Sequence, residues 1–409
     1  MNKRKLFNDP VYGFITIHSD LVFDIIEQPV FQRLRRIRQM GLADYVYLGA
    51  HHTRFHHALG AMHLMECTLE SLRAKGHDIS EHEWESALLA ILLHDVGHGP
   101  CSHALEFSIL SGVKHESLSL LIMRQLDAQF NGALGTAIQM FSGTYPRKFF
   151  NQLIASQLDI DRLDYLNRDS FFTGVTEGTV GAERIIKMLD VANNELVVEE
   201  KGIYSIENFL NARRLMYWQV YLHKTAISAE TMLIQIIRRA KELAKSGAEV
   251  FASPALALFL HPPVRNADFT DNPAYLRAFG QLDDYDIWGA VKIWTQHPDF
   301  TLATLSRMLL ERKLFRIVLT AEKPEPEFVA GIQARLSEYY GLESRNLPYF
   351  CIEGSTSNAA YLAGGTGINI LTKKGKITDI AEASDLPNIK AMSKPVKKYY
   401  VCWAREIVV

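Results

Sequence analysis

The segment LLAILLHDVGHGPCSH, residues 88–103, constrains this chain more than any other part of its sequence. An apolar run typical of a buried helix ends in His94 and Asp95, and the glycines at positions 97 and 99 stop it. Two adjacent side chains chelate one ion only where the backbone is firmly placed, and the end of a buried helix supplies that placement. The pair offers one nitrogen and one oxygen donor, which suits zinc, iron, manganese, cobalt or nickel. The segment therefore predicts half of a site for one divalent metal ion.

Two residues elsewhere complete a metal-ligand set. His57 in RFHHALG lies on the preceding predicted helix and supplies a second imidazole, and Asp161 in LDIDRLDYL supplies a second carboxylate. Taken alone, each of these residues is explained as well by a hydrogen-bonded core histidine or by a helix-capping aspartate. The four together, in the order His57, His94 with Asp95, then Asp161, favour a metal site.

Apolar periodicity predicts a mainly helical chain whose character changes near Phe315. Helical spacing is present at residues 21–40, where Pro29 opens the second of two short helices, and at 59–73, 83–96, 116–130, 149–168, 181–190, 205–243 and 273–282. A short alternating piece at 195–203 is typical of a hairpin, and strand-like pieces follow at 349–353, 367–371 and 399–404. We therefore predict a helical catalytic body over residues 1–314 and a small α+β module over residues 315–409.

Charge and cysteine usage narrow the expected partners and compartment. A formal net charge of -2 gives no bulk electrostatic reason to bind nucleic acid, so any anionic ligand needs local cations. The four cysteines share no CxxC spacing, and the start MNKRKLFNDP lacks the apolar run of a signal peptide. No apolar stretch approaches the ~20 residues that cross a bilayer. We expect a cytoplasmic protein with no membrane partner.

Longer blocks around the metal-ligand residues resemble one branch of a known superfamily. These blocks are FQRLRRIRQMG, YVYLGAHHTRFHHALG, LLHDVGHGPCSHALE, DIDRLDYLNRD and ENFLNARRLMYWQVYLHK. They resemble the deoxynucleoside triphosphate triphosphohydrolases of the HD superfamily, which include bacterial dGTPase-like enzymes and an animal enzyme that joins a SAM domain to an HD domain. The resemblance is specific over residues 5–224 and weaker beyond them. It implies an HD-domain helical body.

The same resemblance implies roles for individual residues. The implied metal ligands are His57, His94, Asp95 and Asp161, and the implied catalytic histidines are His98, His115 and His103. The implied substrate contacts are Arg54, Arg162 and Arg213 to phosphate, Tyr165 as a hydroxyl donor, Asp169 and Tyr221 to the sugar, and Gln39 and Met40 to the sugar and base edge. Arg162 stands where the animal enzyme has a lysine, which keeps the charge but changes the donor geometry.

An activator site is also implied, near the N-terminus. Lys5, Asn8, Glu27, Gln32 and Arg35 fall where the animal enzyme builds a nucleotide activator site between subunits. Glu27 replaces the aspartate that reads guanine there, and a structural helix with surface arginines explains the pattern nearly as well. The resemblance thus implies a homodimer or homotetramer with a nucleotide activator.

The implied reaction is hydrolysis of a dNTP to a deoxynucleoside and tripolyphosphate, by metal-activated water attack on the α-phosphate, with magnesium accompanying the triphosphate. Two alternatives stay open. One is an HD phosphohydrolase that acts on another nucleotide, such as a monophosphate or a guanosine polyphosphate, and the other is a non-catalytic nucleotide-binding regulator. No basic strand with interleaved aromatic residues is present, so nucleic acid is not an expected partner.

Overall fold

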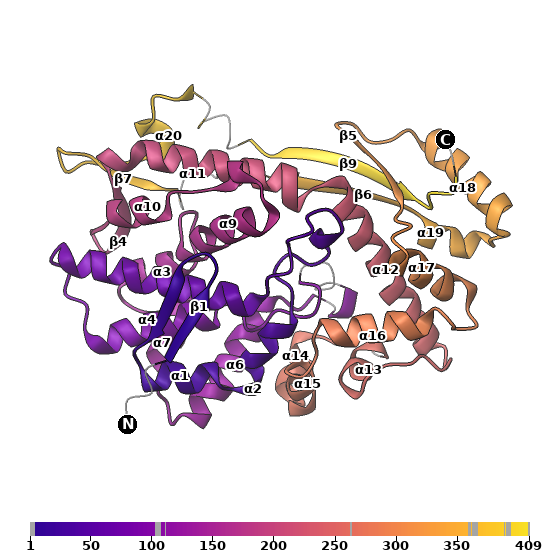
Figure 1. The fold of residues 1–409 in the computed structure, drawn as a ribbon, viewed down its shortest axis with the longest axis horizontal. Coiled ribbons are helices and arrows are strands. Elements are labelled where there is room, and N and C mark those ends of the chain that lie inside the picture. The colour runs from indigo at the N-terminus through magenta and orange to yellow at the C-terminus, as the bar shows by residue number, and fades with distance from the viewer. Residues whose placement is uncertain are drawn as a thin grey trace.

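The computed structural model describes residues 5–102, 108–110, 112–261, 264–358, 361, 367–387, 389 and 394–407. The chain is mainly helical, which confirms the predicted fold class, and small sheets lie along the edges of the helical body (Figure 1). Within these residues, no helix is both long enough and apolar enough to cross a membrane.

The described chain begins with an antiparallel hairpin that periodicity did not predict. In it β1 (Lys5–Asp9) pairs with β2 (Gly13–Ile17) along their whole length. Two short helices follow, α1 (Asp20–Ile26) and α2 (Pro29–Gln32), and Pro29 occupies the first turn of α2 as predicted. A 3-10 turn at Arg33–Arg36 then leads toward the centre of the body.

Three helices meet at the predicted metal residues. The long helix α3 (Arg54–Ala74) packs against both α4 (Glu81–Leu93) and α9 (Ile160–Thr173). Gly60 allows α9 to come close, since a Cβ at this position would lie 2.1 Å from Oδ1 of Asp164. Three further helices follow, α6 (His115–Gln129), α7 (Gly135–Ser142) and α8 (Lys148–Ile154); α7 and α8 pack on α4, and α6 packs on α7.

Two helices predicted as continuous are interrupted. Residues 149–168 hold α8 and the start of α9, separated by a turn in which Asp159 caps α9 by accepting from the Arg162 N–H. Residues 205–243 hold α11 (Ile203–Met216), a π-helical turn at Tyr217–Tyr221 and most of α12 (Lys224–Lys245). Apolar periodicity runs through both breaks, so it could not reveal them.

The predicted hairpin starts earlier in the chain than expected. The strands are β3 (Leu189–Ala192) and β4 (Glu195–Glu199), after α10 (Ala182–Met188), and residue 203 already belongs to α11. The two-residue turn between the strands is Asn193 and Asn194, whose φ angles of 53° and 65° are those a tight hairpin turn requires.

Five short helices form the rest of the helical body. They are α13 (Pro254–Leu260), α14 (Asn266–Asp271), α15 (Pro273–Phe279), α16 (Asp284–Trp294) and α17 (Phe300–Leu310). Helices α13 and α17 pack on α12, and the side chain of Trp294 at the end of α16 is buried. The corner between α15 and α16 contacts the N-terminal segment, since the carbonyl of Leu282 accepts a hydrogen bond from Arg33.

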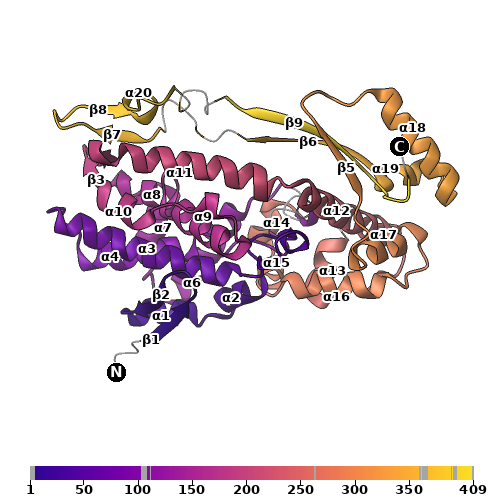
Figure 2. The same cartoon turned by 45° about the horizontal axis from the view of Figure 1, so that its top comes forward.

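The C-terminal residues form strands in two places. A three-stranded antiparallel sheet has the order β5 (Arg316–Thr320), β9 (Val396–Trp403), β6 (Cys351–Asn358), with α18 (Pro326–Tyr340) and α19 (Leu347–Phe350) beside it. At the other end of the molecule, β7 (Asn369–Leu371) pairs in parallel with β4 and continues to β8 (Ile377–Asp379) and α20 (Ile380–Ala383) (Figure 2). The C-terminal part is thus α+β in character, while the boundary between residues 314 and 315 stays a prediction.

Candidate functional site

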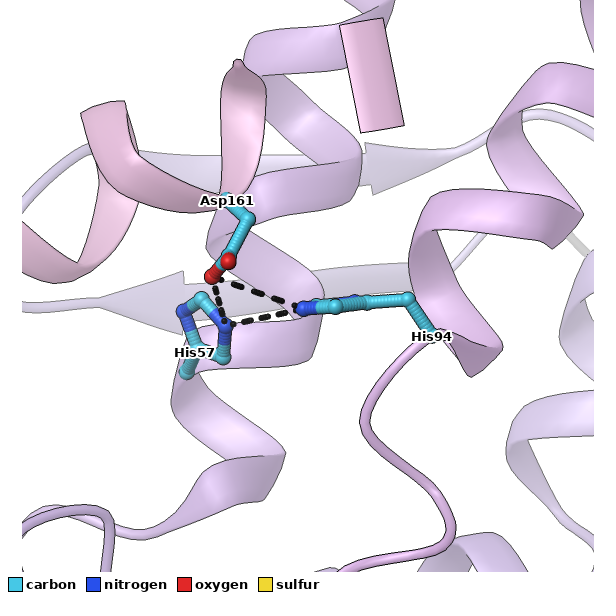
Figure 3. Close-up of side chains that lie close together, drawn as sticks. All are labelled: His57, His94 and Asp161. Carbon is cyan, nitrogen blue, oxygen red and sulfur yellow. Dashed lines mark hydrogen bonds and ion pairs between the residues drawn. The ribbon is translucent and has the colours of Figure 1, made fainter. Parts of the chain in front are cut away.

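Three of the four predicted metal ligands meet at one point. His57 comes from the first turns of α3, His94 caps the C-terminus of α4, and Asp161 lies in the first turn of α9 (Figure 3). The Nε2 atoms of His57 and His94 are 3.4 Å apart, and Oδ1 of Asp161 lies 3.2 Å from the first and 3.5 Å from the second. Segments distant in the sequence thus aim three donor atoms at a single position.

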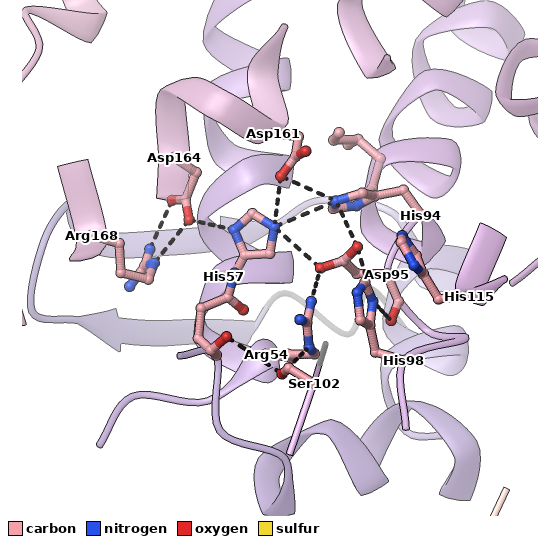
Figure 4. Close-up of polar contacts among 12 residues, drawn as sticks. Arg54, His57, His94, Asp95, His98, Ser102, His115, Asp161, Asp164 and Arg168 are labelled. Carbon is pink, nitrogen blue, oxygen red and sulfur yellow. Dashed lines mark hydrogen bonds and ion pairs between the residues drawn. The ribbon is translucent and has the colours of Figure 1, made fainter. Parts of the chain in front are cut away.

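Asp95, the fourth predicted ligand, faces the same position. Its Oδ2 atom lies 3.6 Å from Nε2 of His57, and its Oδ1 atom lies 3.4 Å from Nε2 of His94 (Figure 4). Ligand atoms held at about 2.0–2.2 Å from one ion are themselves separated by about 3–3.5 Å. Two imidazole nitrogens and two carboxylate groups at this spacing therefore fit one divalent metal ion.

The turn that carries His94 and Asp95 is fixed from α6. The hydroxyl of Ser119 donates to the carbonyl of His94 at 2.7 Å and accepts the N–H of Gly97 at 2.9 Å. A Cβ at Gly97 would lie 2.2 Å from the carbonyl oxygen of His115, so only glycine fits there. The firm placement expected of adjacent ligands thus comes from a helix packed across the turn.

Arg33 holds the same turn from the opposite side. Its guanidinium is fully buried and donates to the carbonyls of Val96 at 2.8 Å and His98 at 2.9 Å. It also donates to the carbonyl of Leu282 at 2.7 Å, in the corner between α15 and α16. A buried charge needs such partners, and here they are backbone carbonyls from two distant segments.

A buried chain of charges orients His57. Its Nδ1 atom lies 2.8 Å from Oδ2 of Asp164, and Arg168 donates to both oxygens of Asp164 at 2.9 and 3.0 Å. Arg168 also pairs with Asp9 of β1 at 2.7 Å. A carboxylate on one ring nitrogen directs the other nitrogen toward a metal, as is usual for ligating histidines.

The charges of the cluster favour cations at its centre. Burial opposes protonation of His57, but hydrogen bonds with Asp161 and Asp164 outweigh it and raise the pKa of His57 to about 10. Burial likewise acts against ionisation of Asp161, yet both imidazoles lower the pKa of that carboxyl group. A proton and a metal ion compete for the same imidazole nitrogen, so a centre that attracts one attracts the other.

Arg54 contacts Asp95, one of the proposed metal ligands, directly. Its side chain is buried at the first position of α3, where its guanidinium forms an ion pair with Asp95 and its Nε donates to the hydroxyl of Ser102 at 3.1 Å. The resemblance assigns Arg54 to phosphate, and it does line the cavity described below. The same group therefore also holds the Asp95 carboxylate in place.

His98 and His115 lie beside Asp95. The rings of the two histidines stack with centroids 3.8 Å apart and an interplanar angle of 28°, and Nδ1 of His98 lies 3.2 Å from Oδ1 of Asp95. Burial, followed by the charge of Arg54, lowers the pKa of His98 well below its usual range, so this imidazole is neutral near pH 7. The third predicted catalytic histidine, His103, falls outside the described residues.

The cluster opens into a cavity of about 570 Å³. Its wall includes the metal-site residues His94, Asp95 and Asp161, and a volume of this size is typical of small-molecule sites. The predicted substrate residues that line it are Gln39, Met40, Arg54, Arg162, Tyr165, Asp169 and Tyr221. Arg213 is not among the lining residues, but its guanidinium carbon lies 5.9 Å from the ring centre of Tyr217, which does line the cavity.

The buried arginines differ in their partners. Arg162 forms an ion pair with Asp159, a carboxylate that the sequence interpretation did not consider and whose pKa burial raises to about 6. Arg213 is only 8% exposed, and its Nε and Nη1 have no hydrogen-bond partner among the described residues. A buried cation without a hydrogen-bonded anion favours an anionic ligand nearby.

A second buried pair lies on the cavity wall at the π-helical turn. The hydroxyl of Tyr221 donates to Oδ2 of Asp169 at 2.7 Å. Nε2 of His52 lies 2.6 Å from the other oxygen of Asp169, and the His52 ring stacks on Phe172 with centroids 4.4 Å apart. Such π-helical turns are frequent at functional sites, and this one sets Tyr221 against Asp169.

The predicted activator residues lie on the N-terminal elements, apart from the cavity lining. Lys5 and Asn8 are on β1 and exposed, and Glu27 caps the end of α1. Arg35 lies over the ring of Phe55 at 3.6 Å and donates to Oε1 of Gln32 at 2.8 Å. Their role in binding a nucleotide stays a prediction.

The sequence interpretation missed several supporting residues. They are Arg33, His52, Asp159, Asp164 and Arg168. The signal for Asp164 and Arg168 was present, because charged residues four apart on a predicted helix can pair, and both sit within DIDRLDYLNRD. No local pattern marks Arg33 or His52, since their partners are far away in the chain.

Comparisons with known proteins identify a family region and several relatives. A family model described as HD associated region matches residues 180–253. The protein YwfO of Bacillus subtilis is 31% identical over 399 residues, which covers 94% of this chain and 88% of that protein. A crystal structure of a phosphohydrolase from Bacteroides thetaiotaomicron has a TM-score of 0.95 and 51% identity, and the match covers 98% of this chain and 100% of that chain.

A more distant relative has a named activity. The human deoxynucleoside triphosphate triphosphohydrolase SAMHD1 is 28% identical over 282 residues. The match covers 58% of this chain and 45% of the human protein. This chain therefore spans less than half the length of that relative.

Proposed function

We propose that this chain, which belongs to the HD superfamily of phosphohydrolases as a dNTPase-like member, hydrolyses deoxynucleoside triphosphates to deoxynucleosides and tripolyphosphate. One observation carries the proposal: the metal-site residues and the Asp169–Tyr221 pair line one cavity of about 570 Å³. A metal-centred end and a hydroxyl-binding pair in one cavity suit a substrate with a phosphate at one end and a sugar beyond it.

His57, His94, Asp95 and Asp161 would hold the metal ion. When bound, a divalent ion such as Zn, Fe, Mn, Co or Ni supplies Lewis acidity at the α-phosphate and makes hydroxide available near neutral pH. The protein's own task at this position is to hold four donors rigid, which Ser119, Arg33 and Asp164 do through the contacts described above.

The arginines would bind the phosphate chain. Arg54 and Arg162 line the cavity, where each also pairs with a carboxylate, and Arg213, whose Nε and Nη1 have no hydrogen-bond partner among the described residues, lies near the lining residue Tyr217. A triphosphate carries about four negative charges near neutral pH. A protein of near-zero net charge binds such a ligand only where cationic side chains gather at one place. Magnesium accompanying the triphosphate would neutralise part of the remaining charge.

The histidine pair would handle the proton of the departing sugar oxygen. Cleavage at the α-phosphorus releases the 5′-oxygen of the deoxynucleoside, which leaves as a hydroxyl once it gains a proton. His98 and His115 stack against each other next to Asp95, and neutral His98 can accept the proton that the attacking water loses, for delivery to the 5′-oxygen. We include His103 in this role only on the resemblance.

Asp169 and Tyr221 would bind the sugar. Oδ2 of Asp169 accepts from Tyr221, and its Oδ1 faces His52, so the carboxylate is held from both sides and is positioned for a 3′-hydroxyl. The Tyr221 ring on the cavity wall then leaves little room for a 2′-hydroxyl. Preference for deoxyribose follows from that contact.

The test is to incubate the purified protein with each of the four dNTPs, singly and in pairs, with Mn, Co, Ni, Fe, Zn or Mg. We expect tripolyphosphate and deoxynucleoside in equal amounts, resolved by anion-exchange chromatography. Release of orthophosphate from a nucleoside monophosphate would support the alternative HD phosphohydrolase. Tight nucleotide binding with no turnover under any metal would support the regulatory alternative, and either result overturns the proposal.

A further inference from the structure

Glu230 is a carboxylate on the cavity wall that the proposed reaction does not use. It lies on α12 four residues after Ala226, and the two side chains share one helix face that lines the cavity. No hydrogen bond or ion pair joins it to another residue in the described part of the chain. Tyr400 of β9 and Cys101 lie close enough for its charge to affect their pKa values.

The segment that faces Glu230 is the one assigned to the base edge. A Cβ at Gly41 would stand 3.5 Å from Oε1 of Glu230, so the carboxylate lies against the backbone there. The same segment contributes Gln39 and Met40 to the cavity. Oε1 of Gln39 is buried and has no hydrogen-bond partner among the described residues.

The carboxylate of Glu230 and Oε1 of Gln39 thus both belong to residues that line the cavity, and neither has a hydrogen-bond donor among the described residues. A buried acceptor without a donor, such as Oε1 of Gln39, is unfavourable, and the half-buried carboxylate of Glu230 also gains from a donor, so these two residues favour a ligand that presents N–H groups. Burial also raises the pKa of Glu230 to about 7. A ligand with N–H donors would stabilise the charged carboxylate and so draw this group to its ionised form.

We propose that Glu230, together with Gln39 of the same cavity, selects the base of the substrate and favours guanine; the inference rests on the dNTP reaction proposed above. Guanine presents two adjacent donors, N1–H and the 2-amino group, which a carboxylate can bind with both oxygens. Adenine and cytosine place an acceptor nitrogen beside their amino group, which repels a carboxylate. Thymine offers one N–H between two carbonyl oxygens, with the same result. Specificity of this kind is strong where a site's polar groups would otherwise be left unpaired.

The experiment compares kcat/KM for dGTP, dATP, dCTP, dTTP and dITP in the wild type, Glu230→Gln and a matched control. The control is Glu66→Gln, because burial also raises the pKa of Glu66 to about 7 and this residue lies outside the cavity. We expect dGTP to be the preferred substrate and Glu230→Gln to lower its kcat/KM by about 10–100-fold, with the other three bases within about 3-fold. The kcat/KM of the wild type for dITP should lie between its value for dGTP and its values for the other three dNTPs, because hypoxanthine keeps N1–H and lacks the 2-amino group.

Equal rates on all bases in the wild type, or a guanine preference that survives in Glu230→Gln, would overturn the inference. Circular dichroism and metal content of Glu230→Gln establish that the variant is folded and loaded. Equilibrium binding of dGTP and dATP, measured by calorimetry, separates this inference from the reaction. Guanine-selective binding that Glu230→Gln abolishes, with no hydrolysis of any dNTP, would overturn the reaction and support base selection. Hydrolysis of all four dNTPs without selectivity would support the reaction and overturn base selection.

Discussion

Nδ1 of His57 lies 2.8 Å from Oδ2 of Asp164, and both side chains are completely buried. The contact joins a proposed metal ligand to a chain of charges that continues through Arg168 to Asp9 of the N-terminal hairpin. Removing one member of such a chain leaves another charge buried without its partner. The orientation of the His57 ring therefore depends on residues that touch neither the metal position nor the cavity.

Replacement of Asp164 by Asn should weaken metal binding. The amide keeps the size of the side chain but loses the charge that directs Nε2 of His57 inward and neutralises Arg168. We expect a loss of about 10–100-fold in metal affinity and of roughly 3 kcal/mol in the free energy of unfolding. Metal titration and denaturant unfolding measure both. Asp190→Asn is the control, because its 2.6 Å contact with His77 is partly exposed and far from the site, and it should change neither quantity.

Loss of a single proposed ligand should remove the metal without unfolding the protein. We expect His94→Ala and Asp161→Ala to be depleted of transition metal and inactive while retaining their helical circular dichroism. Elemental analysis after dialysis gives the metal content. His82→Ala, which removes an exposed hydrogen bond to Thr136, should keep full occupancy. Full occupancy in both ligand variants would mean that the metal position is assigned wrongly.

The sugar selectivity should depend on Tyr221. If its ring packs under the deoxyribose, the wild type should cleave dGTP far better than GTP, and Tyr221→Ala should narrow this gap by about tenfold or more. Rates on the matched pair dGTP and GTP give the ratio directly. Tyr204→Ala, at a position 71% exposed, should leave the ratio unchanged. Equal turnover of GTP and dGTP by the wild type would remove Tyr221 from this role.

Glu66 should lower the free energy of unfolding as the pH rises. Burial, reinforced by Glu70, raises the pKa of Glu66 from 4.5 to about 7, so the folded state holds this proton more tightly than the unfolded state. Its stabilising effect is full below pH 4.5 and is lost as the pH rises through about 7. Glu66→Gln should therefore match the wild type at low pH and be more stable at pH 8. Urea unfolding at both pH values tests this, and a difference that is the same at both would contradict it.

Activation by nucleotides should involve Arg35, on the proposal that the chain forms a homodimer or homotetramer with an activator between subunits. A ligand bound between subunits favours assembly, so one dNTP should accelerate hydrolysis of another. Arg35→Ala should weaken that stimulation with metal content unchanged, and Arg345→Ala, whose side chain is 77% exposed, should not. The measurements are analytical ultracentrifugation with each dNTP and mixed-substrate rates. A monomer indifferent to a second dNTP would show that the N-terminal resemblance is only structural.

The sequence allowed the metal cluster to be grouped because its residues occur in compact motifs. His94 and Asp95 are adjacent, and His57 and Asp161 each sit in a block with its own helical pattern. The fold class followed from apolar periodicity for the same reason, since long helices with one buried face repeat regularly. The structure brings the four residues together as three helices cross, which no local pattern states.

The interruptions of the helices and the contacts that support the site could not be predicted from local sequence patterns. The π-helical turn at Tyr217–Tyr221 interrupts a region whose apolar spacing is continuous, and it decides where Tyr221 lies. The sequence around Glu230 indicates only a solvated helix residue. Its place on the cavity wall becomes clear only from the structure, in which Gly41 lies against its carboxylate. Contacts of this kind depend on tertiary packing, which is fixed only once the whole body has formed.

The buried guanidinium of Arg33 has a consequence for synthesis on the ribosome. It joins the turn at Val96 and His98 to the carbonyl of Leu282, a residue made much later. Domains fold as units during translation, and a nascent chain that ends before Leu282 leaves this buried cation one acceptor short. We therefore expect the metal-binding turn to reach its final form only after Leu282 has emerged, and the unfinished chain to bind the metal ion less tightly than the complete one.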